Sequence, residues 1–132
     1  MAKSDMERAS ATDDKDGVFT GAYAVNPFND EKVQLWVADY VLAGYGTGVV
    51  MGVPAHDTRD FAFAKKYDIP IKVVIHPDEH STLSPNEISE AYTDYGPMVN
   101  SDRFNGLMGK DAIDAITKYA EEKGIGRQQK QF

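Results

Sequence analysis

The spacing of apolar residues changes near the middle of this 132-residue chain, and that change restricts the fold more than any other feature. Before Pro54 the apolar residues alternate with other residues or form short runs, as they do in strands. Over residues 57–67, and again over residues 110–123, they recur three or four positions apart, as they do on one face of a helix. A chain that mixes the two patterns without a regular βαβ repeat is predicted to have an α+β fold.

The first part of the chain predicts a β-hairpin. Residues 18–25 are rich in β-branched and aromatic side chains and are closed by Asn26-Pro27, which is typical of a strand. After a turn at Asn29-Asp30, apolar residues alternate with others over residues 32–41, which predicts a half-buried partner strand. The apolar set of that strand is Val33, Leu35 and Val37.

Further strands are expected beyond the hairpin. Residues 49–53 are an apolar run that stops at Pro54, which predicts a buried strand. Residues 71–75 predict another strand, and the breakers within residues 92–107 favour a second hairpin.

Two helices are predicted from their start and stop signals. Asp57 is a candidate N-cap for a helix over residues 57–67, which has acid in its first turn and lysines near its end. A second helix is expected over residues 110–123, ending at Gly124. The expected buried residues are Phe61, Ala64 and Tyr67 in the first helix, and Ala112, Ile113, Ile116 and Ala120 in the second.

Composition excludes several classes of function. The 14 lysines and arginines against 21 aspartates and glutamates give a net charge of −7, which opposes free-standing attraction to RNA. The absence of cysteine excludes disulfides, thiolate nucleophiles and cysteine-ligated zinc. No signal segment or membrane-spanning run occurs, so we expect a cytoplasmic protein with no membrane partner. Residues 1–16 are expected to be a flexible linker at a cut edge, and residues 17–132 to be the domain.

The glycines of residues 44–48 suggest either a nucleotide-binding loop or a structural turn. A dinucleotide fingerprint requires a third glycine where Met51 stands, and the loop leads into an apolar run instead of a helix. The match to a phosphate-binding loop is therefore weak.

Residues 55–60 place two carboxylates, an imidazole and a guanidinium at the junction between a predicted strand and a helix. Asp57 and Asp60 lie one turn apart on the same face, so they could jointly hold a small cation. Alternatively, Asp57 caps the helix while Asp60 satisfies backbone amides or pairs with Arg59. Both interpretations are open at this point.

Other chemistries have little support in the sequence. His56, His76 and His80 could ligate zinc or manganese, but the prolines around His80 disfavour the helical spacing that would bring the last two together. No Gly-x-Ser-x-Gly turn of a serine hydrolase occurs. The apolar side chains near the acids, Met51, Val53 and Phe61, either belong to the core or line a pocket for an aliphatic side chain.

Three blocks of sequence closely resemble the editing domain of bacterial leucyl-tRNA synthetases. They are residues 17–24 (GVFTGAYA), 36–42 (WVADYVL) and 45–61 (YGTGVVMGVPAHDTRDF), and the likeness continues through residues 104–107 to 124–126. The resemblance implies a curved or barrel-like, mostly antiparallel sheet with packed helices, here truncated. It also implies hydrolysis of the ester bond of tRNA(Leu) that carries a near-leucine amino acid.

The resemblance also implies roles for individual residues. Asp60 corresponds to the acid that binds the α-ammonium of the aminoacyl group and is the expected catalytic residue, with Asp57 as a second acid nearby. The remaining substrate-binding set is Tyr45, Gly46, Thr47, Gly48, Met51, Val53 and His56. No metal or other cofactor is expected in this fragment, and ATP and Mg would belong to the parent's separate aminoacylation domain. The implied partners are the tRNA(Leu) 3′ end and the rest of the synthetase chain.

The sequence departs from the family pattern in two ways. Gln34, Gly52 and Ala62 replace residues that are more often proline, alanine and glutamate. The family's threonine-rich segment and its signatures for ATP do not occur. The alternative expectation is therefore a non-catalytic folding or binding module of the same enzyme, inactive without that segment.

Overall fold

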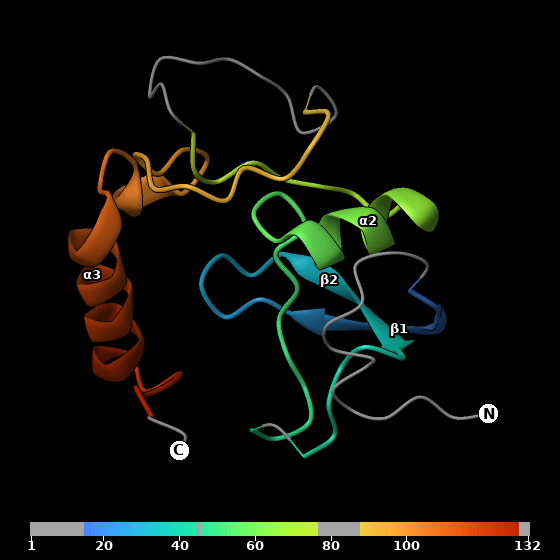
Figure 1. Ribbon diagram of the computed structural model, residues 1–132. Coiled ribbons are helices and arrows are strands. Elements are labelled where there is room, and N and C mark those ends of the chain that lie inside the picture. Colours follow the sequence, from blue (N-terminus) through green and yellow to red (C-terminus); the bar gives the residue numbers. More distant parts are fainter. Residues whose placement is uncertain (1–14, 45, 77–87, 130–132) are drawn as a thin grey trace. The chain divides into compact units, whose positions relative to one another are not determined.

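A computed structural model describes residues 15–44, 46–76 and 88–129 of the chain. These residues form two compact units that divide between Gly52 and Val53. The first contains a two-stranded antiparallel sheet and the second contains two α-helices, so the predicted α+β class is confirmed (Figure 1). Most of the predicted linker, residues 1–14, lies outside the described residues.

The sheet of the first unit is the hairpin that the sequence predicts. Strand β1 (Gly17–Val25) pairs antiparallel with strand β2 (Lys32–Ala38), with Val18 opposite Val37 and Val25 opposite Lys32. The Asp30 N–H donates to the Asn26 carbonyl at 2.8 Å and closes the turn. A bulge interrupts the register between Phe19 and Tyr23, where the chain bends.

The burial predicted for β2 is wrong. Val33, Leu35 and Val37 are 37 %, 36 % and 67 % exposed, whereas Trp36 between them is half-buried. The Trp36 ring stacks on Phe19 of β1 with 5.5 Å between ring centroids. The alternating pattern identified the two faces of the strand, but an apolar face is buried only where a second layer covers it. No such layer exists among the described residues of the first unit.

The predicted strand over residues 49–53 is also wrong, because these residues have no regular secondary structure. Val49 and Met51 are 71 % and 62 % exposed. A strand that is apolar on both sides needs a partner strand and covering layers to be buried. The described part of the chain supplies neither at this position.

The second unit begins with the first predicted helix, α2 (Thr58–Lys66). Its N-cap is Asp57, and Lys65 and Lys66 occupy its last turn, as expected. Phe63 and Ala64 are its buried residues, whereas Phe61 is only partly buried. The core around the helix consists of Ala55, Ala64, Ile71 and Val73.

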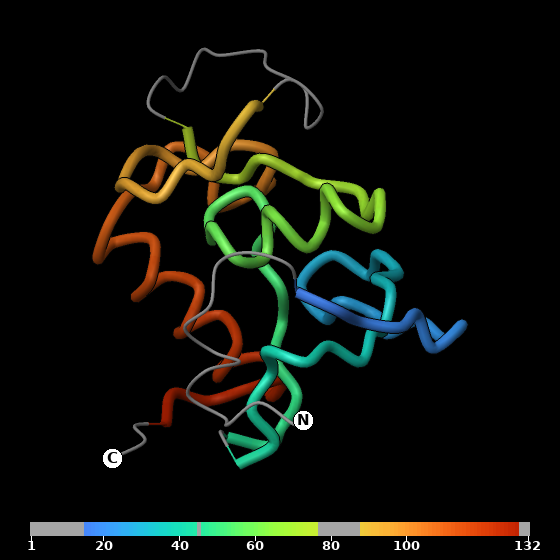
Figure 2. Tube along the Cα trace, turned by 45° about the vertical axis from the view of Figure 1, so that its right-hand side comes forward, coloured from blue at the N-terminus to red at the C-terminus, as the bar shows by residue number. Residues whose placement is uncertain are grey.

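Residues 71–75 and 92–107 pair less regularly than predicted. Ile75 forms an isolated bridge with Met98, and the Val99 N–H donates to the Val74 carbonyl at 2.8 Å. The two segments therefore run side by side, as both views show (Figure 2). In place of a full second hairpin, Pro97 bridges Met108, and the 3-10 helix η2 (Asp102–Phe104) fills the connection between them.

The last helix, α3 (Gly109–Glu122), confirms the strongest helical pattern in the sequence. The chain leaves it at Gly124, which has a φ of 70°, and the Ile125 N–H bonds the Ala120 carbonyl at 3.0 Å. Ala112 and Ala120 are buried as predicted, but Ile113 is 53 % exposed. Among the described residues, no helix is long and apolar enough to cross a membrane.

Candidate functional site

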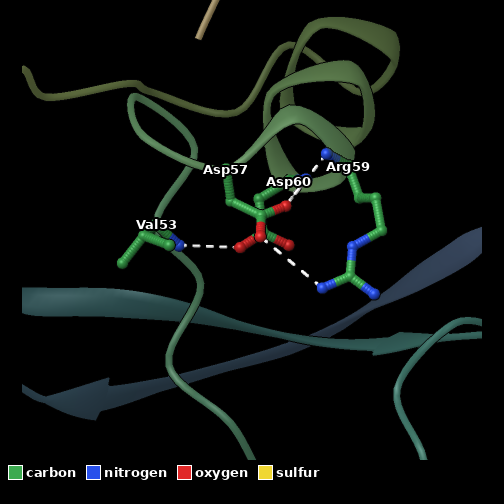
Figure 3. Close-up of polar contacts among 4 residues, drawn as sticks. All are labelled: Val53, Asp57, Arg59 and Asp60. Carbon is green, nitrogen blue, oxygen red and sulfur yellow. Dashed lines mark hydrogen bonds and ion pairs between the residues drawn. The ribbon is translucent and has the colours of Figure 1, made fainter. Parts of the chain in front are cut away.

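The predicted acidic junction is a tight corner, residues 53–60, in which the chain turns into α2. The N–H groups of His56 and Asp57 both donate to the Val53 carbonyl at 2.9 Å, which closes the turn before the helix. Ala55 within the turn is 1 % exposed and belongs to the core. The corner is therefore anchored by the apolar packing of Ala55. Figure 3 shows the side chains of Asp57, Arg59 and Asp60 together with Val53.

Asp57 caps α2, as one of the two open interpretations predicts. Its Oδ1 accepts hydrogen bonds from the N–H groups of Arg59 at 2.9 Å and Asp60 at 3.0 Å. Its Oδ2 lies 3.5 Å from a guanidinium nitrogen of Arg59. These contacts satisfy N–H groups that the first turn of a helix leaves without a partner.

Asp60 points back across the corner. Its Oδ2 accepts a hydrogen bond of 2.9 Å from the Val53 N–H, seven residues earlier in the chain (Figure 3). Val53 is thereby held at both ends of its backbone, because its carbonyl accepts the two bonds that close the turn. A carboxylate offers about four acceptor positions, so this bond is compatible with a second donor at Asp60.

His56 is held by the backbone of two other segments. Its Nε2 accepts hydrogen bonds from the N–H groups of Val74 and Ile75, both at 3.1 Å. Its Nδ1 lies 2.9 Å from the Tyr92 carbonyl, which can only accept, so Nδ1 carries the proton and the ring is neutral. Burial lowers the pKa of His56 from its ordinary value of 6.5, and the hydrogen bond to Tyr92 opposes that shift.

A cavity of about 260 Å³ lies on the His56 side of the corner. Apolar side chains line most of it, and its polar lining includes His76, Glu90 and Tyr92. Of the residues singled out by sequence, His56 lines this cavity, whereas Val53, Asp57 and Asp60 do not. The two carboxylates and the cavity are thus separate features of the second unit.

The predicted glycine-loop residues belong to the first unit, apart from Tyr45, which lies outside the described residues. The Thr47 hydroxyl accepts a hydrogen bond from the Val49 N–H at 3.3 Å. Gly48 has a φ of 82°, and a Cβ there would lie 3.0 Å from the Ala43 carbonyl oxygen. Gly48 is therefore required by the backbone itself, which supports the structural-turn interpretation for that glycine.

A metal centre gains no support from the described residues. They contain no group of three histidine, aspartate or glutamate side chains placed to hold a metal ion. His80, one of the three candidate ligands, lies outside the described residues. His56 has both ring nitrogens engaged by backbone groups.

Sequence reasoning missed the anchoring contacts of His56. Its partners lie 18, 19 and 36 positions further along the chain, so no local spacing indicated them. The one signal available in the sequence was its place directly before the predicted helix cap, Asp57.

The sequence of the chain matches a family of aminoacyl-tRNA synthetase editing domains. Residues 1–121 match the family described as "Leucyl-tRNA synthetase, editing domain". The chain therefore belongs to the leucyl-tRNA synthetase editing-domain family, and the resemblance noted in its sequence is confirmed.

Individual relatives agree with the family assignment. The chain is 56 % identical over 119 residues to "Leucine--tRNA ligase" of Brachyspira hyodysenteriae, which covers 90 % of this chain and 14 % of that protein. It is 52 % identical over 131 residues to the protein of the same name from Trichodesmium erythraeum, covering 99 % of this chain and 14 % of the relative. The protein of that name from Citrifermentans bemidjiense is 50 % identical over 133 residues, covering 100 % of this chain and 16 % of the relative. The chain thus spans about 14 to 16 % of the length of these relatives.

Proposed function

We propose that this chain is part of a leucyl-tRNA synthetase and carries part of the site that hydrolyses mischarged tRNA(Leu). The observation that carries the proposal is the corner of residues 53–60, where Asp57 and Asp60 share one turn of backbone. The family match and the relatives named Leucine--tRNA ligase support the same assignment.

Asp60 is proposed to bind the α-ammonium group of the misattached amino acid. A hydrogen bond between an ammonium and a carboxylate is charge-assisted and contributes about 1.5 to 3 kcal/mol. The bond from the Val53 N–H holds Asp60 Oδ2 against the corner, so the carboxylate is oriented before a substrate arrives. Asp57 adds a second negative charge to the corner while it caps α2.

The proposed reaction is ester hydrolysis by water. Water adds to the ester carbonyl, the bond from that carbon to the 3′-terminal ribose oxygen breaks, and a proton from the water passes to the ribose oxygen. The products are the free amino acid and uncharged tRNA. Catalysis then depends on orientation of the ester and on electrostatic stabilisation, and requires neither a side-chain nucleophile nor a metal.

A synthetase needs such a site because a single pocket discriminates poorly between amino acids of similar size. One apolar pocket distinguishes side chains that differ by a methylene by only about 1 to 3 kcal/mol, and aminoacyl-tRNA synthetases are the standard example of a second, hydrolytic sieve. The proposed substrates are tRNA(Leu) carrying norvaline, isoleucine or methionine. The residues proposed to contact the amino acid and the terminal adenosine are Tyr45, Gly46, Thr47, Gly48, Met51 and Val53. His56, which the sequence placed in the same set, has both ring nitrogens bonded to backbone groups.

The proposal also covers the larger sheet, the aminoacylation domain and the partners of the parent enzyme. The hairpin β1-β2 is proposed to be part of a larger curved or barrel-like sheet, since Val18 and Val37 of its apolar face are 69 % and 67 % exposed in this chain. ATP and Mg are proposed to act in a separate aminoacylation domain of the same cytoplasmic enzyme. The tRNA(Leu) 3′ end and the rest of the synthetase are the proposed partners.

The test is a chimera in which this chain replaces the matching segment of the Brachyspira hyodysenteriae relative. We expect the chimera to hydrolyse isoleucyl- or norvalyl-tRNA(Leu), and Asp60→Ala to lower kcat/KM by roughly 10- to 150-fold, the equivalent of about 1.5 to 3 kcal/mol. Asp60→Asn is the matched control, because its amide oxygen can still accept from the Val53 N–H while the charge is lost. Ammonium binding predicts that Asn is as impaired as Ala.

The second candidate is a non-catalytic module of the same enzyme. The net charge of −7 and the capping role of Asp57 favour it, since both are explained without a substrate. This candidate predicts that Asp60→Asn hydrolyses as fast as the unmodified chimera.

A further inference from the structure

We propose that His56 is a positioning residue of the editing corner, whose neutral imidazole fixes residues 53–60 to the backbone at residues 74–75 and 92. The inference rests on the proposed function, because it names the residue that holds Asp57 and Asp60 in place for that reaction. It differs from the role expected from sequence, in which His56 contacts the substrate.

The hydrogen bonds of His56 join three stretches of chain at one side chain. The ring accepts from the N–H groups of Val74 and Ile75 at 3.1 Å and meets the Tyr92 carbonyl at 2.9 Å. The Tyr92 N–H in turn donates to the carbonyl of Ala55, the neighbouring residue, at 2.9 Å. Two hydrogen bonds therefore join the corner to Tyr92, and two more join it to Val74 and Ile75.

Because His56 lies between Val53 and Asp57 in the chain, holding His56 in place also holds the carboxylates of Asp57 and Asp60 in place. Its own N–H closes the turn on the Val53 carbonyl, and the next residue, Asp57, caps the helix. The Val53 N–H is the donor that orients Asp60. A movement of His56 therefore displaces Val53 and Asp57 together, and through Val53 it displaces Asp60.

Only one protonation state fits these partners. Two N–H donors converge on Nε2, so a proton on that atom would face both of them. An imidazolium would thus lose two bonds and keep one. The lowered pKa of His56 agrees with a ring that stays neutral.

The variants His56→Gln and His56→Ala separate the anchoring role from other roles. A glutamine amide places its carbonyl oxygen near the position of Nε2, and that oxygen can accept from both N–H groups, but it cannot titrate. Alanine removes all the contacts of the ring. In the chimera, we expect His56→Ala to lower kcat for mischarged tRNA(Leu) by about tenfold to a hundredfold, as misplacement of a site by about 1 Å does, and His56→Gln to restore most of it.

Amide and imidazole NMR of this chain tests the geometry without any substrate. We expect Nδ1 to be protonated and Nε2 unprotonated at neutral pH, and the amide signals of Val53, Asp60, Val74 and Ile75 to shift in His56→Ala. Those signals are expected to stay near their original positions in His56→Gln. A proton on Nε2 at neutral pH, or unshifted Val53 and Asp60 amides in a folded His56→Ala chain, would overturn the proposal.

The outcome is independent of the test of the proposed function. If Asp60→Asn hydrolyses normally, the editing role of Asp60 fails, while the NMR result still decides whether His56 positions the corner. If Asp60→Asn is inactive but His56→Ala is as active as the unmodified chimera, the editing role stands and the positioning role is wrong.

Discussion

The corner of residues 53–60 and the apolar run of residues 49–51 are neighbours in sequence but differ in what determines their structure. In the corner, the side chains of Asp57 and Asp60 bond to backbone groups at most seven residues away. In the run, Val49, Val50 and Met51 are 71 %, 52 % and 62 % exposed and form no strand. Local hydrogen bonds therefore specify the helix cap and the turn of the corner, and the bonds of His56 add its attachment to residues 74–75 and 92. The run has the composition of a strand, but the described residues supply no partner strand for it.

The largest effect on stability is predicted for Gly96→Ala, in the segment that pairs with residues 74–76 of the second unit. A Cβ at Gly96 would lie 2.6 Å from the carbonyl oxygen of His76, in backbone that pairs with residues 74–76. We expect a loss of about 1 to 3 kcal/mol, as for overpacking elsewhere, measured by urea unfolding. Gly44→Ala is the control in the glycine loop, since a Cβ there meets nothing within 4 Å. If Gly44→Ala destabilises the chain as much as Gly96→Ala, the close approach of Gly96 to the His76 carbonyl does not cause the loss.

Loss of the helix cap is expected to have the next largest effect. Asp57→Ala removes the acceptor of the Arg59 and Asp60 N–H groups and should destabilise the second unit by about 1 kcal/mol. Asp57→Asn should change stability little, because asparagine is also a good N-cap. If Asn destabilises as much as Ala, the charge of Asp57 and not its capping bond stabilises the corner.

The third predicted effect is a loss of stability at acidic pH that His56 causes. Because burial lowers the pKa of His56 in the folded chain below 6.5, the unfolded chain binds the proton more readily. The contribution of neutral His56 to the stability of the folded chain is therefore fully present above about pH 6.5. It is lost as the pH falls from there towards the pKa of His56 in the folded chain. His76, Glu90 and Tyr92 line the cavity beside the ring, so a variant of His56 itself is needed to assign the effect to that residue.

The control for this pH dependence is His56→Gln, which keeps an acceptor for the Val74 and Ile75 N–H groups but cannot titrate. Urea midpoints of the two proteins should run parallel above pH 6.5 and diverge below it. Parallel curves down to pH 4.5 would assign the acid sensitivity to other groups.

The smallest effect is expected in the exposed run. Val50→Thr keeps a β-branched side chain on a residue that is 52 % exposed, so the free energy of unfolding should change by less than about 0.5 kcal/mol. A loss above about 1 kcal/mol, measured by the same urea method, would show that the run is buried in solution.

The same contrast explains which features the sequence could predict. The helix α2 and its cap follow from residues 57–67 alone, and the hairpin follows from two alternating segments joined by a short turn. The partners of His56 lie 18 to 36 residues away, and nothing local to His56 encodes them. The exposure of Val33, Leu35 and Val37 depends on whether another layer covers the hairpin, which the pattern of one strand cannot specify.

The most direct measurement of the central claim is a titration of this chain with two stable analogues of norvalyl-adenosine. One analogue carries the α-ammonium group, and the other has a hydroxyl group in its place. The account predicts that the ammonium analogue binds at least tenfold more tightly, equivalent to about 1.4 kcal/mol, and that Asp60→Asn abolishes this preference. A preference for the ammonium that persists in Asp60→Asn would contradict the assignment of Asp60 as its ligand.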